Sequence, residues 1–335
     1  MDTAEAYQTC EEITWSQARN FAYGIRLLPA GKRQSLAALY AFARRIDDIG
    51  DGNMAAPDKL AALEAARSEI ASLAELSAPE PSAPESSAPG TSAPPADDPV
   101  LVALADTGRR FPVPLAAFGE LIDGCVADTK GTTYTSFDEL QYYCRCVAGS
   151  IGRLSLGVFG TGDPQAAVPL ADSLGVALQI TNILRDIRED YQNGRVYLPA
   201  EDLDRFGVTL KPSGEPDPTA EPAPDAAAEA RFVTLIEFEA ARARDWYGTG
   251  LQLLPLLDAR SAACTGAMAG IYRKLLDRII AEPAAVLHGR LSLSPREKAM
   301  VAVSSLARPL LPGRARAARA ARLVPSEPPA PEQRS

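Results

Sequence analysis

Apolar residues recur at the three- and four-residue spacing of an α-helix in every long patterned segment of this sequence. A half-buried β-strand would instead alternate apolar and polar residues, and no convincing run of that kind is present. The sequence therefore predicts an all-α fold. The segments with helical spacing are 12–29, 33–46, 58–76, 140–160, 168–190, 230–254 and 263–282.

Three proline-rich segments interrupt the helical pattern. Residues 76–98 repeat Ser-Ala-Pro, residues 211–229 are acidic and rich in proline, and the tail 312–335 joins an Arg/Ala stretch to more proline. Such compositions bury too little apolar surface to offset the entropy of ordering, so we expect two disordered inserts and a disordered tail. About 270 residues remain, enough for two domains or one large helical bundle. The motifs described below favour a single domain over 1–311.

Composition excludes several classes of function. The net charge is −9, so the basic surface that nucleic-acid binding needs is missing. The single histidine, His288, rules out a multi-histidine metal site. Five cysteines without CxxC spacing indicate free thiols in a reducing cytosol. The N-terminus is acidic, unlike a signal peptide, and no uninterrupted apolar run reaches the ~18 residues of a membrane span, so we expect a cytoplasmic protein.

The sequence LYAFARRIDDIGD ends in three aspartates within five positions. On a helix, Tyr40, Arg44, Asp47 and Asp51 fall at i, i+4, i+7 and i+11 and form one stripe. Asp48 lies about 100° around the helix from Asp47, so we expect it to have a secondary role. The helix therefore presents two carboxylates, one turn apart, beside an arginine and a tyrosine.

A second stripe of the same kind follows about 130 residues further along the chain. Gly175, Gln179, Asn182, Asp186 and Asp190 fall at i, i+4, i+7, i+11 and i+15 of a helix. The surrounding segment, LGVALQITNIL, is apolar and typical of a buried helix. The sequence therefore predicts carboxylates on a helix that is largely buried.

A solvated acidic surface explains either stripe alone about as well as a binding site does. Two carboxylates ~6 Å apart, however, repel by roughly 3 kcal/mol at an effective dielectric of 20. If both stripes face one cavity, hard oxygen ligands of this number are typical of Mg²⁺ that also binds a phosphorylated substrate. Nearby arginines can hold phosphate oxygens, and the candidates are Arg44, Arg45, Arg185 and Arg195.

Two long motifs give the chain a family resemblance. The segments at 40–51 (YAFARRIDDIGD) and 178–207 (LQITNILRDIREDYQNGRVYLPAEDLDRFG) resemble the two signatures of the squalene/phytoene synthase family. ARNFAYGIRLLP, YCRCVAGSIGRLSLGVFG and, more weakly, IYRKLLDRI and LHGRLSL are similar to other family blocks in the same order. The resemblance implies an isoprenoid (terpenoid) synthase fold, a single-domain helical bundle with a central cavity. It also implies Mg²⁺-dependent head-to-head (1'–1) condensation of two prenyl diphosphates with release of diphosphate.

The same resemblance implies roles for individual residues. The acids of both stripes, with Asn182, would bind the metals, and Arg44, Tyr143 and the four aspartates would form the catalytic group. Aromatic residues would line the cavity near an allylic cation, and Tyr143 would also assist proton transfer. The sequence NGRVYLP would end the second acidic helix and bring Arg195 and Tyr197 to the cavity. The expected metal ligands are Asp47, Asp51, Asn182, Asp186 and Asp190, and the expected substrate contacts are Phe21, Tyr40, Arg44, Gln179, Asn182, Arg185, Arg195, Tyr197 and Arg290.

Within the family, the sequences of three segments most resemble those of bacterial presqualene diphosphate synthases of the hopanoid route, the actinobacterial ones in particular. We therefore expect two farnesyl diphosphates as substrates, presqualene diphosphate as product, and no use of NADPH. The alternatives are a phytoene synthase, a squalene or dehydrosqualene synthase, a terpene cyclase and a non-catalytic helical partner protein. Downstream enzymes of squalene synthesis are candidate partners, and the Arg-rich piece 314–322 is a candidate for peripheral contact with an anionic membrane.

Overall fold

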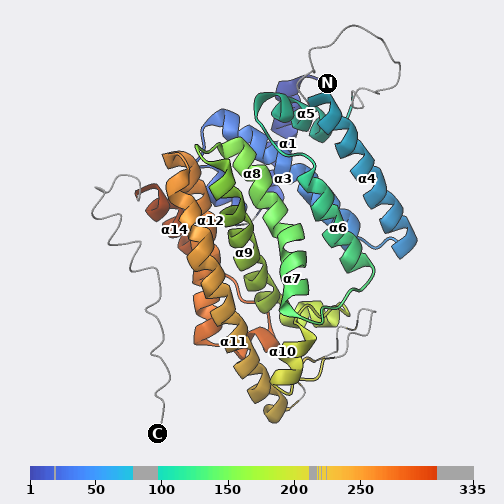
Figure 1. The fold of residues 1–335 in the computed structure, drawn as a ribbon, viewed down its shortest axis with the longest axis vertical. Coiled ribbons are helices and arrows are strands. Elements are labelled where there is room, and N and C mark those ends of the chain that lie inside the picture. The colour runs from blue at the N-terminus through green and yellow to red at the C-terminus, as the bar shows by residue number, and fades with distance from the viewer. Residues whose placement is uncertain are drawn as a thin grey trace.

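The computed structural model describes residues 1–307 apart from 19, 78–96, 211–216, 218, 220 and 224. This part of the chain is a bundle of α-helices without a strand, so the predicted all-α fold is confirmed (Figure 1). The helices of the first half are α1 (Thr3–Gln17), α2 (Phe21–Ile25), α3 (Ala30–Asp51), α4 (Ala56–Ser77), α5 (Pro99–Arg110), α6 (Ala117–Thr129), α7 (Phe137–Cys144), a π-turn (Arg145–Gly149) and α8 (Ser150–Phe159). Those of the second half are α9 (Pro164–Gln192), α10 (Ala200–Arg205), α11 (Ala226–Gly250), a 3-10 turn (Leu251–Leu256), α12 (Ala259–Ala281), α13 (Ala285–His288) and α14 (Pro295–Ala307).

Two apolar clusters form the core of the bundle. One joins α1, α3, α5, α6 and α8, and in it Phe42 and Phe118 are fully buried and pack edge to face at 4.9 Å between ring centroids. The other joins α7, α9, α11 and α12 around Phe232 and Tyr247. Helix α9 contributes its first turns to one cluster and the turns from Leu174 onward to the other. It therefore connects the two halves of the core.

Among the described helices, α9 is also long and apolar enough to cross a membrane, judged by length and composition alone. Its most apolar 18-residue window has a mean hydropathy of 1.3, and 61% of that window is buried inside the bundle. The helix packs against α8, α11 and α12 (Figure 1). Its apolar residues therefore serve as the core of the bundle.

The helices extend further into the proline-rich segments than expected. Helix α4 continues through Ser77, and α11 begins at Ala226, so the last four residues of the expected insert 211–229 are helical. Asp98, placed in the first insert, instead caps α5, because its side chain accepts hydrogen bonds from two backbone amides of the first turn. Most of the first insert, nine of the 19 residues of the second and the whole tail 312–335 lie outside the described residues.

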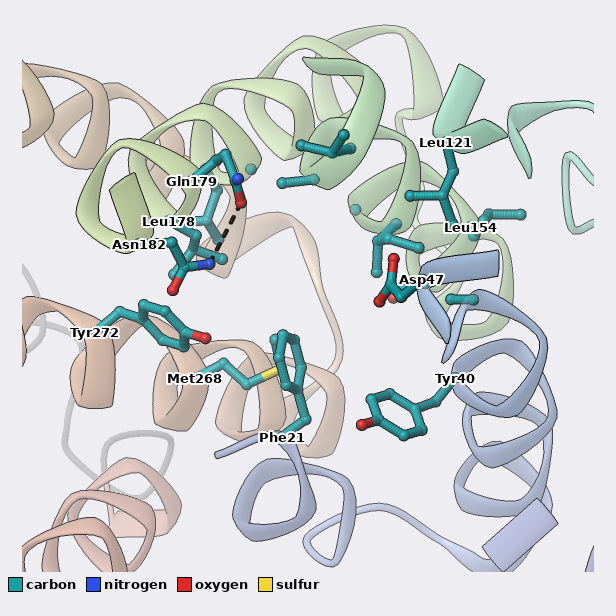
Figure 2. A pocket seen from close by; sticks show the side chains of 18 of the residues that line it. Phe21, Tyr40, Asp47, Leu121, Leu154, Leu178, Gln179, Asn182, Met268 and Tyr272 are labelled. Carbon is teal, nitrogen blue, oxygen red and sulfur yellow. Dashed lines mark hydrogen bonds between the residues drawn. The ribbon is translucent and has the colours of Figure 1, made fainter. Parts of the chain in front are cut away.

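The segment 12–29 is not one continuous helix as its periodicity suggests. Helix α1 ends at Gln17, and α2 begins only at Phe21. The Phe21 side chain then contributes to a central cavity between the helices (Figure 2). The break between α1 and α2 therefore lies next to a residue of the cavity wall, although the apolar spacing of the sequence continues across it.

The segment 140–160 is helical throughout but changes its winding at the π-turn Arg145–Gly149. The backbone of this turn lies against Gly175 of α9. A Cβ added at Gly175 would come within 2.5 Å of the Gly149 amide nitrogen. Glycine at 175 therefore permits the close approach of the two helices.

Helix packing at Gly250 gives a stability prediction. A Cβ added at Gly250 would lie 2.6 Å from the backbone of Leu174, whereas one added at Gly248 would meet no described atom within 4 Å. Gly250→Ala is therefore expected to lower the free energy of unfolding by about 1–3 kcal/mol through overpacking. Gly248→Ala, in the same helix, is expected to raise it by about 0.5–1 kcal/mol. Urea unfolding followed by circular dichroism measures both, and shifts of the same sign would contradict this packing.

Candidate active site

A cavity of about 500 Å³ lies between the two halves of the bundle. Its wall comes from α2, α3, α6, α7, α8, α9 and α12, together with the π-turn, the 3-10 turn and the loop that follows α9. Figure 2 shows Phe21, Tyr40 and Asp47 around the cavity, with Gln179 and Asn182 of α9 facing it from another side. Charged residues gather at one end. The other end is apolar and includes Ile25, Leu36, Leu156, Phe159 and Leu253.

Helix α3 contributes the first acidic stripe to this cavity. Tyr40, Arg44, Asp47 and Asp51 all line it, as the helical spacing predicts. Burial, reinforced by the charge of Asp51, raises the pKa of Asp47 to about 7. Asp48 does not line the cavity, because its side chain is 51% exposed and pairs with Arg44. The structure thus separates Asp48 from the other two aspartates.

Helix α9 contributes the second stripe, and Gly175, Gln179, Asn182, Asp186 and Asp190 all line the cavity. Asn182 Nδ2 donates a hydrogen bond to Gln179 Oε1 at 3.3 Å, whereas Asn182 Oδ1 is buried without a partner among the described residues. Burial, together with the charge of Asp186, raises the pKa of Asp190 to about 8. An orphaned acceptor and a carboxylate disfavoured in its charged form are both features that a cation would satisfy.

Arginines pair with the acids from several directions. Arg195 Nη1 lies 3.0 Å from Asp51 Oδ1, Arg290 Nε lies 3.0 Å from Asp186 Oδ1, and Arg185 pairs with the same Asp186. Arg185 and Arg195 line the cavity. Arg290 does not line the cavity, and it contacts the site only through Asp186 and Glu189. Of the expected substrate contacts, Arg290 therefore lies outside the cavity wall, and so does the phosphate candidate Arg45, which pairs with Asp98 and Glu69.

Aromatic side chains line the wall between the charged and apolar ends. The ring of Phe21 lies 6.2 Å from that of Tyr40 and 6.3 Å from that of Tyr272. Tyr143 and Tyr197 stack with ring centroids 5.3 Å apart. All five line the cavity, and only Tyr272 is absent from the residues expected from the sequence. Each aromatic face can stabilise a nearby cation by about 0.5–2 kcal/mol.

Asp128 is a cavity residue that sequence reasoning does not identify. It lies near the end of α6 and accepts hydrogen bonds from Tyr143 Oη at 2.8 Å and from Tyr197 Oη at 3.0 Å. Burial raises its pKa to about 6. A signal was present, because Leu121, Cys125 and Asp128 fall at i, i+4 and i+7, so that an acid continues an apolar stripe. All three line the cavity.

The loop after α9 brings Arg195 and Tyr197 to the cavity, as its sequence predicts. Gly194 has a φ of 74°, a left-handed conformation that favours glycine. The Arg195 amide then donates a hydrogen bond to the Asp190 carbonyl at 2.8 Å. The turn therefore attaches Arg195 directly to the end of the second acidic stripe.

A buried ionic cluster fixes the far end of this loop, where α10 begins. Arg242 of α11 pairs with Asp202 of α10 and with Glu239, each at 2.8 Å, and its guanidinium lies over the Phe137 ring at 3.9 Å. Glu239 is only 1% exposed. This burial raises the pKa of Glu239 to about 8, even though Arg242 opposes the shift. Arg242 thus forms ion pairs with two buried carboxyl groups.

Stability should depend on pH through Glu239. Its pKa is about 8 in the folded state against an ordinary 4.5, so the folded protein binds this proton more tightly. The resulting stability is fully present below the ordinary pKa and is lost as the pH rises through about 8. Between about pH 6 and pH 9, the Tm of the wild type is expected to fall several degrees more than that of Glu239→Gln. Thermal melting across this range measures the difference, and parallel curves would contradict it.

The donor set at the charged end fits a hard divalent cation. It consists of carboxylate oxygens and the unpaired amide oxygen of Asn182. In the described part of the chain, no three acids, cysteines or histidines are close enough to form a ligand cluster by themselves. Oxygen atoms of a bound anion would therefore complete the coordination, as is common for Mg²⁺. The arrangement can hold a phosphorylated group at one end and an apolar chain at the other.

Comparisons with known proteins agree with this architecture. A phytoene synthase of Mycobacterium tuberculosis is 48% identical over 303 residues, which cover 90% of this chain and 91% of that protein. A phytoene synthase of Arthrospira platensis is 34% identical over 290 residues, covering 82% of this chain and 84% of that protein. Both similarities extend over most of each chain.

Solved structures confirm the isoprenoid synthase fold. A dehydrosqualene synthase crystallised with a ligand superposes with a TM-score of 0.75 at 28% identity, over 90% of this chain and 96% of that one. The squalene synthase HpnC from Alicyclobacillus acidocaldarius gives a TM-score of 0.69 at 27% identity, over 86% of this chain and 97% of that one. The sequence pattern of the squalene/phytoene synthase family matches residues 16–297. The chain therefore belongs to the squalene/phytoene synthase family.

Proposed function

We propose that the protein joins two farnesyl diphosphates head to head (1'–1), releasing diphosphate and forming presqualene diphosphate. Family membership supports the reaction class, the head-to-head condensation of two prenyl diphosphates. The observation that carries the proposal is the single cavity with two acidic helices and their arginines at one end and apolar side chains at the other. The diphosphates would bind at the charged end and the prenyl chains at the apolar end.

The apolar wall of the cavity continues below the acids on both long helices. On α3 the first lining residue, Leu36, precedes Asp47 by eleven positions, and on α9 Ala171 precedes Asp186 by fifteen. At about 1.5 Å per residue, the two helices provide roughly 16 Å and 22 Å of wall below their first acid. A prenyl chain therefore has room along both helices, and the choice of farnesyl diphosphate rests on the resemblance of three sequence segments to presqualene diphosphate synthases.

Mg²⁺ would supply the positive charge that offsets the charge developing on the leaving diphosphate. The chain's own residues supply the remaining chemistry. Arginines orient the diphosphates, aromatic faces stabilise the allylic cation, Tyr143 assists the proton transfer that closes the cyclopropane, and the apolar wall excludes water that would quench the cation. The proposed metal ligands are Asp47, Asp51, Asn182, Asp186 and Asp190, and the proposed diphosphate ligands are Arg44, Arg185 and Arg195, with Arg290 behind Asp186.

Condensation of two geranylgeranyl diphosphates is the second candidate. It is favoured by the names of the relatives, because proteins 48% and 34% identical to this chain are called phytoene synthases. The two reactions would use the same charged end and differ in the depth that each prenyl chain requires. Chain length is therefore the property to measure.

Incubation of the purified chain with radiolabelled farnesyl or geranylgeranyl diphosphate and Mg²⁺, with and without NADPH, tests the proposal. A C30 cyclopropyl diphosphate that accumulates even with NADPH is the expected product. Phytoene from geranylgeranyl diphosphate would establish the second candidate instead. Squalene from this chain alone would show that the reaction continues past the cyclopropane, and cyclic C15 products would overturn the head-to-head assignment.

The proposed location is the cytoplasm. All five cysteines are unpaired and buried, which supports a reducing compartment. The Arg-rich piece 314–322, for which membrane contact is expected, lies outside the described residues.

A further inference from the structure

Asp128 lies where two tyrosines of the cavity wall meet. Tyr143 Oη is 2.8 Å from one of its carboxylate oxygens, and Tyr197 Oη is 3.0 Å from the other. The two tyrosines come from distant parts of the sequence, one from α7 and one from the loop after α9, and all three residues line the cavity. One carboxylate therefore joins two hydroxyl groups across the wall of the cavity.

Hydrogen-bond chemistry sets the direction of both hydroxyl groups. An ionised carboxylate only accepts hydrogen bonds, and each phenol has a single proton to donate. The charge of Arg195 favours the ionised form of Asp128 against the effect of burial. Both phenol protons are then committed to Asp128, so the lone pairs of both oxygens remain available to other groups in the cavity.

We propose that Asp128 is a positioning residue that holds the hydroxyl groups of Tyr143 and Tyr197 with their lone pairs, and not their protons, facing the prenyl chain. Dipoles fixed in this direction stabilise positive charge as it develops on the allylic carbon, and they need no reorganisation during the reaction. The stacking of the two rings at 5.3 Å keeps both oxygens in this arrangement. The inference rests on the head-to-head reaction proposed above, because that reaction generates the allylic charge.

Asp128→Asn tests this role in the full-length protein. Asparagine has nearly the same size, but its amide nitrogen donates to one phenol oxygen and so reverses that hydroxyl group. With Mg²⁺ and the prenyl diphosphate that the wild type uses, kcat is expected to fall on the order of 100-fold while KM changes by less than about twofold. The variant should also form more prenyl alcohol for each diphosphate that it releases, because water intercepts a poorly stabilised cation. This ratio is the alcohol share. Tyr197→Phe, which removes one hydroxyl, should show a smaller change in the same direction.

Tyr134→Phe is the matched control. The Tyr134 ring lies 5.3 Å from that of Tyr143, but its hydroxyl has no hydrogen-bond partner among the described residues and does not line the cavity. Its kcat and alcohol share are expected to match the wild type. The inference is overturned if Asp128→Asn keeps the wild-type kcat and alcohol share, if it lowers only Tm, or if Tyr134→Phe loses as much activity. A wild type that forms no head-to-head product from either substrate would overturn the proposed function first, so the two failures are distinguishable.

Discussion

Asp47→Asn is expected to lower kcat/KM on the order of 1,000-fold while making the metal-free protein more stable. The activity falls because the variant loses a carboxylate at the point where the first acidic stripe enters the cavity. Stability rises because burial and the neighbouring Asp51 disfavour the charged form of Asp47, and asparagine removes that charge without changing the size of the side chain. Steady-state kinetics and thermal melting at about pH 8 measure the two effects.

Asp48→Asn provides the control for this prediction. Asp48 is adjacent in sequence and carries the same charge, but its side chain is 51% exposed and lies outside the cavity. We expect its kcat/KM to stay within about threefold of the wild type, since exposed ion pairs contribute about 0–1 kcal/mol. Equal losses in the two variants would show that the helix end as a whole, and not the cavity-facing stripe, carries the activity.

The acidic stripes could be predicted because helical geometry alone decides which residues share a face. Once α3 and α9 are assigned as helices, the spacing places Asp47 with Asp51 and Asp186 with Asp190, whatever the helices pack against. The same geometry separates Asp48 from its neighbours, and the structure agrees. Local periodicity therefore contains most of the information about these two helices.

Asp128 could not be placed in the same way, because its role depends on contacts between elements. Its stripe on α6 has a single acid, so no repeated charge distinguishes it from a helix end near solvent. Only the packing of α6 against its neighbours brings the carboxylate to Tyr143 and Tyr197, which lie 15 and 69 residues away in sequence. The break after Gln17 is similar, since apolar spacing continues through 12–29 and does not mark where the backbone turns.

The double exchange Asp186→Asn with Asp190→Asn is expected to reduce kcat/KM on the order of 10,000-fold, because both carboxylates of the second stripe are lost from the cavity. Binding of inorganic pyrophosphate should reveal the cause. Arg185 and Arg290 both pair with Asp186 in the metal-free protein, so removal of this acid frees them for an anion. Pyrophosphate without Mg²⁺ is therefore expected to bind the variant more tightly than the wild type, by about tenfold.

Mg²⁺ should change pyrophosphate binding in the wild type but not in the double variant. In the wild type it is expected to strengthen pyrophosphate binding, because it gives the acids another partner as the arginines turn to the anion. In the double variant this gain should disappear, and calorimetric titration at controlled free Mg²⁺ measures both. Glu189→Gln is the matched control, since Glu189 shares the helix, contacts Arg290 at 3.3 Å and does not line the cavity. A double variant that folds, keeps its activity at low Mg²⁺ and still shows the Mg²⁺-dependent gain would mean that the second stripe is not a metal site.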